Sequence, residues 1–317
     1  MFRICLLLGL LLSGAFVPTL ALDANWTYRQ VNCTVQTPAS YDVVCGMLTV
    51  PENRAVTDSA RIDLAIMHIS SDSNAPERDP VVYITGGPGS PLLRNASSIA
   101  RYDPVHNILE SRDLILMDTR GTGESQPALI CEAGLDLRAM YAVADTSDSY
   151  QTTLLSGFQA CHDELTAQGI DLSAYRTRET AADFDALRQA LGITEWNLFG
   201  ASYGSKIALT VARDYPDSVR SLILDAAYPL DVNILRDYVQ NAETAFGELF
   251  STCASQQRCA RHYHDLEDSF YALYDQLNAN PVTLSVRTYD RDTVEVIFTG
   301  TRMYQWAFGW LYQTRLI

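Results

Sequence analysis

Positive charge is the first thing that this sequence has little of. It holds 23 lysine and arginine residues against 38 aspartate and glutamate residues, for a net charge of −15, and Lys206 is its single lysine. A protein that binds a nucleic-acid backbone needs surplus cations to displace the counterions of the phosphates. We therefore expect no nucleic-acid partner. The negative net charge favours solubility and does not indicate a particular substrate.

Long apolar runs are also absent beyond the amino terminus. Met1-Phe2-Arg3 is a short positive start, Ile4 to Val17 is apolar, and Thr19-Leu20-Ala21 places small residues before a cleavage point. The apolar run is shorter than the ~20 residues of a membrane-spanning helix. These features predict a signal peptide over residues 1–21 and an exported mature chain, extracellular or periplasmic, without stable membrane association; an uncleaved anchor is the alternative.

The cysteines lack the spacing of a zinc site, because no two of them are separated by two residues. Six of the seven cysteines remain after signal removal, and an even number in an exported chain favours disulfides. Six cysteines allow many connectivities, and sequence alone does not choose among them. The simplest guess is local pairing, which joins Cys33 to Cys45, Cys131 to Cys161 and Cys253 to Cys259. We expect no metal and no cofactor.

What the sequence does contain is an alternation of strands and helices. Short apolar runs followed by glycine or aspartate predict strands that are buried on both faces, at 81–84, 114–117, 196–199 and 222–224. Between them lie helical patterns such as Arg178 to Leu191. Such alternation predicts an α/β fold, a mostly parallel sheet with helices on both faces.

The two ends of the chain have a different character. Segments 43–50 and 61–69 alternate polar and apolar residues, which suits antiparallel strands at the start of the sheet. After Pro229 the spacing of leucines predicts an amphipathic helix over 266–277, and 282–286 with 294–298 predicts a hairpin around residues 289–292.

A candidate nucleophile follows the strand that ends at Phe199. Gly200-Ala201-Ser202-Tyr203-Gly204 matches the G-x-S-x-G pattern and precedes a helical run from Lys206 to Arg213. A tight strand-to-helix turn of this kind lifts a serine clear of the sheet, so Ser202 is the predicted nucleophile. The backbone N–H of Tyr203, at the helix start, would face a developing oxyanion. An ordinary glycine-rich turn is the alternative interpretation.

A second glycine-rich loop supports this interpretation. Thr85-Gly86-Gly87-Pro88-Gly89 follows the strand that ends at Ile84, and its backbone N–H groups could face a reacting carbonyl oxygen. We expect Gly87 to be the second oxyanion donor, with Gly86 as the next candidate. The segment Asp118 to Ser125 closes the following strand and lacks the lysine of a phosphate loop, so we expect Asp118 and Arg120 to bond neighbouring loops.

These motifs, taken in order, resemble those of a known family. The loop at Gly86, the segment from Asp118, the stretch from Thr180 to Gly192 and the run from Trp196 to Gly204 look like the α/β-hydrolase family of proline iminopeptidases and secreted tripeptidyl aminopeptidases. The resemblance covers roughly residue 41 to the end of the chain. It implies a hydrolase core over residues 22–229 and a helical cap or lid insertion over residues 230–317, with a peptide as substrate. Thr85 departs from the histidine that many iminopeptidases have there.

The rest of a catalytic triad is what the sequence lacks. In this fold the acid and the histidine follow the nucleophile. His68, His106 and His162 precede Ser202, and His262 and His264 lie in the region that resembles the cap. Asp225 ends the next strand, but in the resembled family that aspartate is not the triad acid. The triad acid and histidine are therefore not found in this chain, which we interpret as a carboxyl-terminally incomplete enzyme.

Three functions stay open on these grounds. The leading one is a secreted serine exopeptidase that releases residues or short peptides from amino termini through an acyl-enzyme on Ser202, with these 317 residues inactive by themselves. Glu243 and Glu248 in the expected cap are candidates to meet the substrate's ammonium group. A carboxylesterase or lipase on the same fold, and a non-catalytic binding protein, are the alternatives.

Overall fold

The structure is a computed structural model of the chain, and it describes residues 25–131, 136–288 and 291–312. The predicted signal peptide at 1–21 lies outside these residues, and so do positions 289 and 290 of the predicted hairpin turn. Within the ranges described, no helix is both long enough and apolar enough to cross a bilayer.

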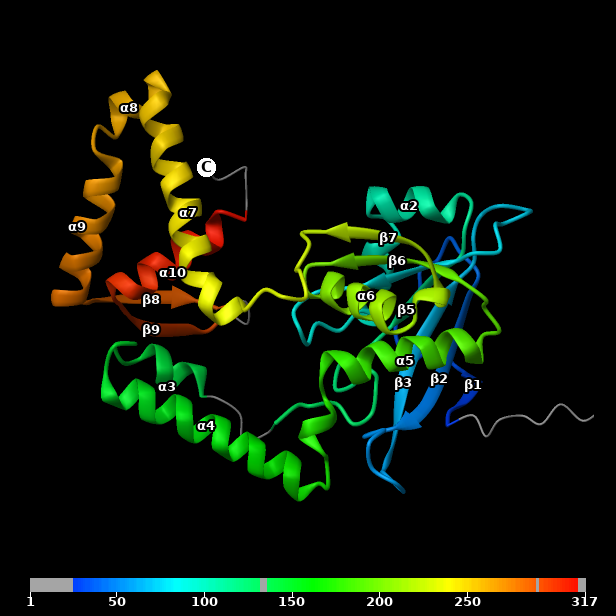
Figure 1. Cartoon of the computed structure of the whole chain (residues 1–317). Coiled ribbons are helices and arrows are strands. Elements are labelled where there is room, and N and C mark those ends of the chain that lie inside the picture. Colours follow the sequence, from blue (N-terminus) through cyan, green and yellow to red (C-terminus); the bar gives the residue numbers. More distant parts are fainter. Residues whose placement is uncertain (1–24, 132–135, 289–290, 313–317) are drawn as a thin grey trace, which may run out of the picture.

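A seven-stranded sheet forms the larger part of the molecule (Figure 1), with the strand order β1-β2-β3-β5-β4-β6-β7. The first three strands and β5 pair antiparallel, whereas β5, β4, β6 and β7 run parallel to their neighbours. The predicted α/β fold with an antiparallel start is therefore confirmed. The strands are β1 Thr27–Val31, β2 Val43–Pro51, β3 Arg61–Ile69, β4 Val81–Ile84, β5 Leu114–Met117, β6 Trp196–Ala201 and β7 Val219–Asp225.

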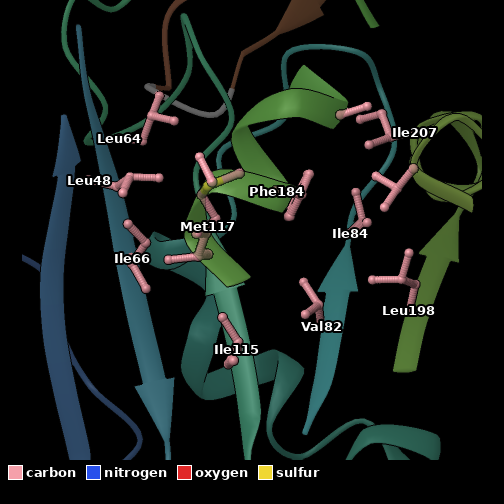
Figure 2. Close-up of a cluster of buried hydrophobic side chains, with 14 of the residues drawn as sticks. Leu48, Leu64, Ile66, Val82, Ile84, Ile115, Met117, Phe184, Leu198 and Ile207 are labelled. Atoms are coloured by element: carbon pink, nitrogen blue, oxygen red, sulfur yellow. The ribbon is translucent and has the colours of Figure 1, made fainter. Parts of the chain in front are cut away.

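Helices cover both faces of the sheet, and each face has its own apolar core. Along β5, Ile115 and Met117 point into one core, which Phe184 of α5 and Ile207 of α6 complete (Figure 2). Leu114 and Leu116 point into the other, beneath α1 and α2. Alternate side chains of a strand are therefore buried on opposite faces of the sheet. This explains why the strands appear in the sequence as unbroken apolar runs. The helices are α1 Ala96–Ile99, α2 Asp103–Leu109, α5 Thr177–Ala190 and α6 Tyr203–Asp214, with 3₁₀ turns at Leu93–Asn95, Leu172–Ala174 and Pro216–Ser218.

A second group of elements follows β7 and lies to one side of the sheet (Figure 1). Its centre is aromatic: the ring of Phe246 packs 5.1 Å from Phe270 and 4.6 Å from Tyr304. The predicted amphipathic helix and hairpin are both present here. The elements are α7 Ile234–Ser255, α8 Gln257–His262, α9 Leu266–Ala279, β8 Val282–Arg287, β9 Thr293–Phe298 and α10 Gly300–Trp310.

Two helices between β5 and α5 pack with this second group. These are α3 Leu137–Tyr141 and α4 Asp148–Ala167. The buried guanidinium of Arg302, on α10, donates to the carbonyl oxygens of Met140 and Tyr141 at 2.7 and 3.2 Å. Thr299 donates to Asp145 at 2.6 Å beside it. The second group of elements therefore packs with sequence that precedes Ser202, and the cap and its boundary at residue 229 stay predictions.

All three locally paired disulfides are present. Cys33 bonds Cys45, Cys131 bonds Cys161, and Cys253 bonds Cys259. The first ties the loop after β1 to β2, and the third ties α7 to α8. The structure therefore forms the three disulfides that local pairing of the cysteines predicts.

β7 lies at one edge of the described sheet. In the described sheet, β7 has a neighbour on one side only, and the side chain of Ile223 on it is 43% exposed. An apolar edge strand with open backbone groups templates association between molecules. Replacing Ile223 with lysine (Ile223→Lys) should delay aggregation, measured by light scattering at a fixed protein concentration during slow heating, because charge on an edge opposes strand addition.

The matched control is Val56→Lys. Val56 is 52% exposed but lies in the loop between β2 and β3, away from any strand edge. Equal delays from both lysines would mean that net charge, and not the edge of β7, controls aggregation.

Candidate active site

Ser202 lies in a sharp turn between β6 and α6. Its backbone has φ 53° and ψ −122°, a region that residues with side chains rarely adopt. The turn is held on both sides: the Ser202 N–H donates to the carbonyl oxygen of Asp225 at 2.8 Å, and the Ser205 amide donates to the Ser202 carbonyl oxygen at 2.9 Å. Such strain persists only where surrounding contacts impose it, and it marks functional sites.

Close packing beneath the turn explains the glycine two residues after Ser202. A side chain at Gly204 would overlap the carbonyl oxygen of Ile84, at the end of β4. Glycine therefore lets α6 start directly against the neighbouring strand. This contact sets the direction in which Ser202 leaves the sheet.

The loop after β4 lies against Ser202. A β-carbon added at Gly86 would stand 2.7 Å from Cβ and 3.0 Å from Oγ of Ser202. The amides of Gly87 and Tyr203 have no hydrogen-bond acceptor in the part of the chain that the structure describes. Two unengaged donors, one on each loop beside the serine, are what an oxyanion site requires.

A cavity of about 380 Å³ opens beside this turn. The loops after β4 and β5 and the first turns of α5 and α6 line it. Tyr203 faces the cavity with its ring fixed, because its hydroxyl is 2.7 Å from Oγ1 of Thr177. Leu129 and Ile130 add an apolar wall. A partly apolar pocket with a few polar groups is typical of a ligand site.

Asp118 joins the loops under the cavity, as we expected from the sequence. Its side chain is fully buried, and one oxygen accepts from the amides of Leu92 and Leu93 at 2.6 and 3.0 Å. The other accepts from the amide of Glu124 at 2.8 Å. Three N–H donors satisfy the buried carboxylate, which stabilises its charge.

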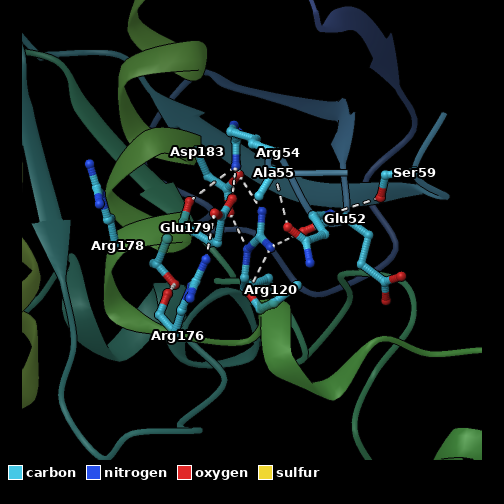
Figure 3. Close-up of polar contacts among 12 residues, drawn as sticks. Glu52, Arg54, Ala55, Ser59, Arg120, Arg176, Arg178, Glu179 and Asp183 are labelled. Carbon is cyan, nitrogen blue, oxygen red and sulfur yellow. Dashed lines mark hydrogen bonds and ion pairs between the residues drawn. The ribbon is translucent and has the colours of Figure 1, made fainter. Parts of the chain in front are cut away.

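Arg120 joins a second set of segments (Figure 3). It forms a bidentate ion pair with Asp183 on α5, with N–O distances of 2.7 and 2.8 Å. Both side chains are almost completely buried. It also donates to the carbonyl oxygens of Glu52 and Ala174. The sequence predicted the role of Arg120 but not its partner, because Asp183 lies 63 residues further along the chain.

Arg54 completes this charged cluster from the end of β2. It donates to Asp183 at 2.7 Å and to Glu179 at 3.0 Å (Figure 3). Burial opposes the charge of Arg54, but the two carboxylates outweigh it and raise the pKa of its guanidinium. Burial and a hydrogen bond to Glu52 raise the pKa of the neighbouring Tyr175 phenol. The cluster thus holds the cavity wall by paired charges.

None of the five histidines is hydrogen-bonded to Ser202 in the residues described. His68 contacts Asp113 at 2.8 Å and His106 contacts the Tyr41 hydroxyl at 3.0 Å. His162 contacts Asp163 on α4, while His262 and His264 are exposed at α8 and just after it. Asp225 lies opposite Ala201 on the neighbouring strand. The structure therefore brings the serine and the two loops together and brings no histidine to them.

The chain is similar to several known proteins. The family described as alpha/beta hydrolase fold matches residues 79–291. YuaR of Escherichia coli, which carries a hydrolase name, is 27% identical over 86% of this chain and 55% of its own length. The serine protease Hip1 of Mycobacterium tuberculosis is 26% identical over 76% of this chain and 47% of its own. The tripeptidyl aminopeptidase of Streptomyces lividans is 28% identical over 62% and 37%. The chain spans about half the length of the curated relatives it matches, or less.

The contact between Gly86 and Ser202 gives a second prediction. Gly86→Ala should leave the fold intact but displace the loop or the serine, because the new methyl group would stand 2.7 Å from Ser202 Cβ. We expect modification of Ser202 by a fluorophosphonate to slow at least ~10-fold, measured by mass spectrometry of the serine peptide. Gly247→Ala on α7, where a β-carbon meets nothing within 4 Å, is the control; similar rates in both variants would contradict the assigned contact.

The buried cluster gives a third prediction. Asp183→Asn leaves the buried Arg120 without a counter-charge and Arg54 with Glu179 alone, so the free energy of unfolding in urea should fall by about 3–5 kcal/mol. The exposed variant Asp163→Asn on α4 should keep the urea midpoint of the wild type. A small loss in Asp183→Asn would show that Glu179 or water compensates the arginines.

Proposed function

The chain belongs to the alpha/beta hydrolase fold family, and on that premise we propose that it is a serine hydrolase with Ser202 as nucleophile. The observation that carries the proposal is the strained backbone of Ser202 on a strand-to-helix turn. Gly86 lies directly against the serine's Oγ. A plain glycine-rich turn has no need of that strain or of that close contact.

The mechanism follows from the groups around the serine. Oγ of Ser202 attacks the substrate carbonyl carbon and loses its proton to a base, and the carbonyl oxygen becomes an oxyanion. The N–H groups of Tyr203 and Gly87 hold that oxyanion. Collapse of the intermediate expels the leaving group and leaves an acyl-enzyme, which water then hydrolyses.

We propose peptides as substrates, cut near a free amino terminus. Support comes from relatives named serine protease and tripeptidyl aminopeptidase. The proposal extends to an exported protein, for which the three disulfides are suited. An esterase is the second candidate, because the apolar wall that Leu129 and Ile130 give to the cavity would also accept an acyl chain.

We further propose that these 317 residues turn over substrate slowly by themselves. Ser202 has no histidine partner among the described residues, so deprotonation of its hydroxyl lacks a base. The nucleophile and the oxyanion donors would still be in place. Added imidazole should then restore part of the lost base function.

The fourth prediction tests this arrangement directly. Fluorophosphonate modification of Ser202 should be slow in buffer and should accelerate several-fold with added imidazole, measured by mass spectrometry. Ser202→Ala should abolish the modification, and Gly86→Ala should weaken the imidazole effect because the serine is displaced. Labelling that is unchanged in Ser202→Ala would place the nucleophile elsewhere, and no labelling of the wild type under any condition would favour the non-catalytic alternative.

The acyl preference separates a peptidase from an esterase. We compare p-nitrophenyl esters of a tripeptide with a free amino terminus, of its N-acetylated form and of hexanoic acid, so that all three share one leaving group. The release of p-nitrophenol above the Ser202→Ala background should be fastest with the free tripeptide. A hexanoyl ester that reacts as fast or faster would overturn the peptidase proposal in favour of the esterase.

A further inference from the structure

Ser205 is completely buried in the first turn of α6, three residues after Ser202. Its hydroxyl donates to the carbonyl oxygen of Ser202 at 2.5 Å, and it accepts from the backbone N–H of Tyr228 at 2.7 Å. A hydroxyl can donate and accept at once, which neither an N–H nor a carbonyl group can do. Ser205 therefore connects the turn at Ser202 to the segment that follows β7.

That segment holds both backbone polar groups of Ser202. The Ser202 N–H donates directly to the carbonyl oxygen of Asp225, the last residue of β7, at 2.8 Å. The Ser202 carbonyl oxygen is linked to the same segment through the Ser205 hydroxyl and the Tyr228 N–H. Ala226, which lies between these two contacts, also has a positive φ, of 50°. The strained turn at Ser202 is thus matched by a second strained residue in the segment that holds it.

A further contact fixes Tyr228 on α6. The ammonium group of Lys206 lies 4.1 Å from the centre of the Tyr228 ring. A cation over an aromatic face is attracted by the negative charge density of that face. Tyr228 is therefore anchored twice, at its N–H by Ser205 and at its ring by Lys206, and its N–H is kept within reach of the Ser205 hydroxyl.

The Ser202 carbonyl group and the Tyr203 N–H belong to one peptide unit. Such a unit is planar and trans, so its C=O and N–H bonds point in opposite directions. A hydrogen bond that fixes the direction of the Ser202 carbonyl oxygen therefore also fixes the direction of the Tyr203 N–H. That N–H has no acceptor among the described residues, as an oxyanion donor requires.

We propose that Ser205 is a positioning residue, whose hydroxyl aims the Tyr203 N–H at the oxyanion by holding the carbonyl end of the same peptide unit. This role rests on the proposed function, in which Ser202 is the nucleophile. Ser205 itself does not touch the substrate, because it is completely buried. The donor acts when negative charge develops on the substrate oxygen, so a misdirected N–H should slow the chemical step and leave substrate binding unchanged.

A buried hydroxyl that only stabilises α6 is the alternative, and Thr210 offers a matched control for it. Thr210 lies five residues further along the same helix and is 3% exposed. Its hydroxyl donates to the carbonyl oxygen of Lys206 at 2.7 Å. Thr210→Val therefore removes a similar buried hydrogen bond without changing a contact of the Ser202 turn, and its effect on the urea midpoint should resemble that of Ser205→Ala.

The first measurement is the rate of fluorophosphonate modification of Ser202 at a series of reagent concentrations, with imidazole present. Ser205→Ala should lower the maximal rate at least ~5-fold and leave the half-saturating concentration unchanged. Thr210→Val should keep both values of the wild type. Ser205→Thr, which restores a hydroxyl, should recover part of the maximal rate.

The second measurement is amide hydrogen exchange at Tyr228 by NMR, which needs no reaction at Ser202. In Ser205→Ala the Tyr228 N–H loses its acceptor, so its exchange should accelerate at least ~10-fold, whereas Thr210→Val should keep the rate of the wild type. Lys206→Met removes the cation over the ring but keeps the hydroxyl bridge, so its maximal rate of modification should stay within ~2-fold of the wild type.

Three outcomes would contradict the positioning role alone, in a wild type that is modified at Ser202. They are an unchanged maximal rate in Ser205→Ala, equal slowing in Ser205→Ala and Thr210→Val, and slowing in Lys206→Met as large as that in Ser205→Ala. Unchanged exchange at Tyr228 in Ser205→Ala would remove the hydroxyl bridge itself. No modification of the wild-type serine under any condition would overturn the proposed function, and the positioning role with it.

Discussion

The ion pair between Arg120 and Asp183 is the constraint on which the loops around the candidate site depend. It is buried between the loop after β5 and α5, and Arg54 and Glu179 extend it to the end of β2. Removing these charges from water is costly, so they persist only where each has a partner at good geometry. Loops that would otherwise move over the surface are tied to the sheet at this point, and one wall of the cavity is fixed by it.

The strained turn at Ser202 is held by contacts of its own. A positive φ at a serine is unfavourable by itself, and it is maintained by β6, by the start of α6 and by the carbonyl of Asp225 on β7. Close approach at Gly204 and Gly86 then brings the loop after β4 against the turn after β6 at one edge of the sheet. Parallel strands place their carboxyl ends at the same edge, so the site is a consequence of topology as much as of motif.

The second group of elements is held together by different interactions. Its own core is a cluster of phenylalanine and tyrosine rings, and Arg302 fastens α3 and α4 to it through carbonyl oxygens from a distant part of the chain. Periodicity predicted α9 and the hairpin, because those patterns are local. It could not predict that α3 and α4 would pack there, since the contact lies between residues about 160 apart in sequence.

The sequence alone was sufficient to predict the elements that carry the candidate site, because the apolar runs, the turn at Ser202 and the loop at Gly86 are each encoded in consecutive residues. It was also sufficient for the local disulfide pairs. Tertiary structure decided the partner of Arg120 and the packing of α3 and α4 with the second group of elements. The physical reason is that helix and strand propensities and turn chemistry act between residues that are neighbours in sequence. Buried ion pairs depend instead on which distant residues the packed sheet and helices bring within a few ångströms of each other.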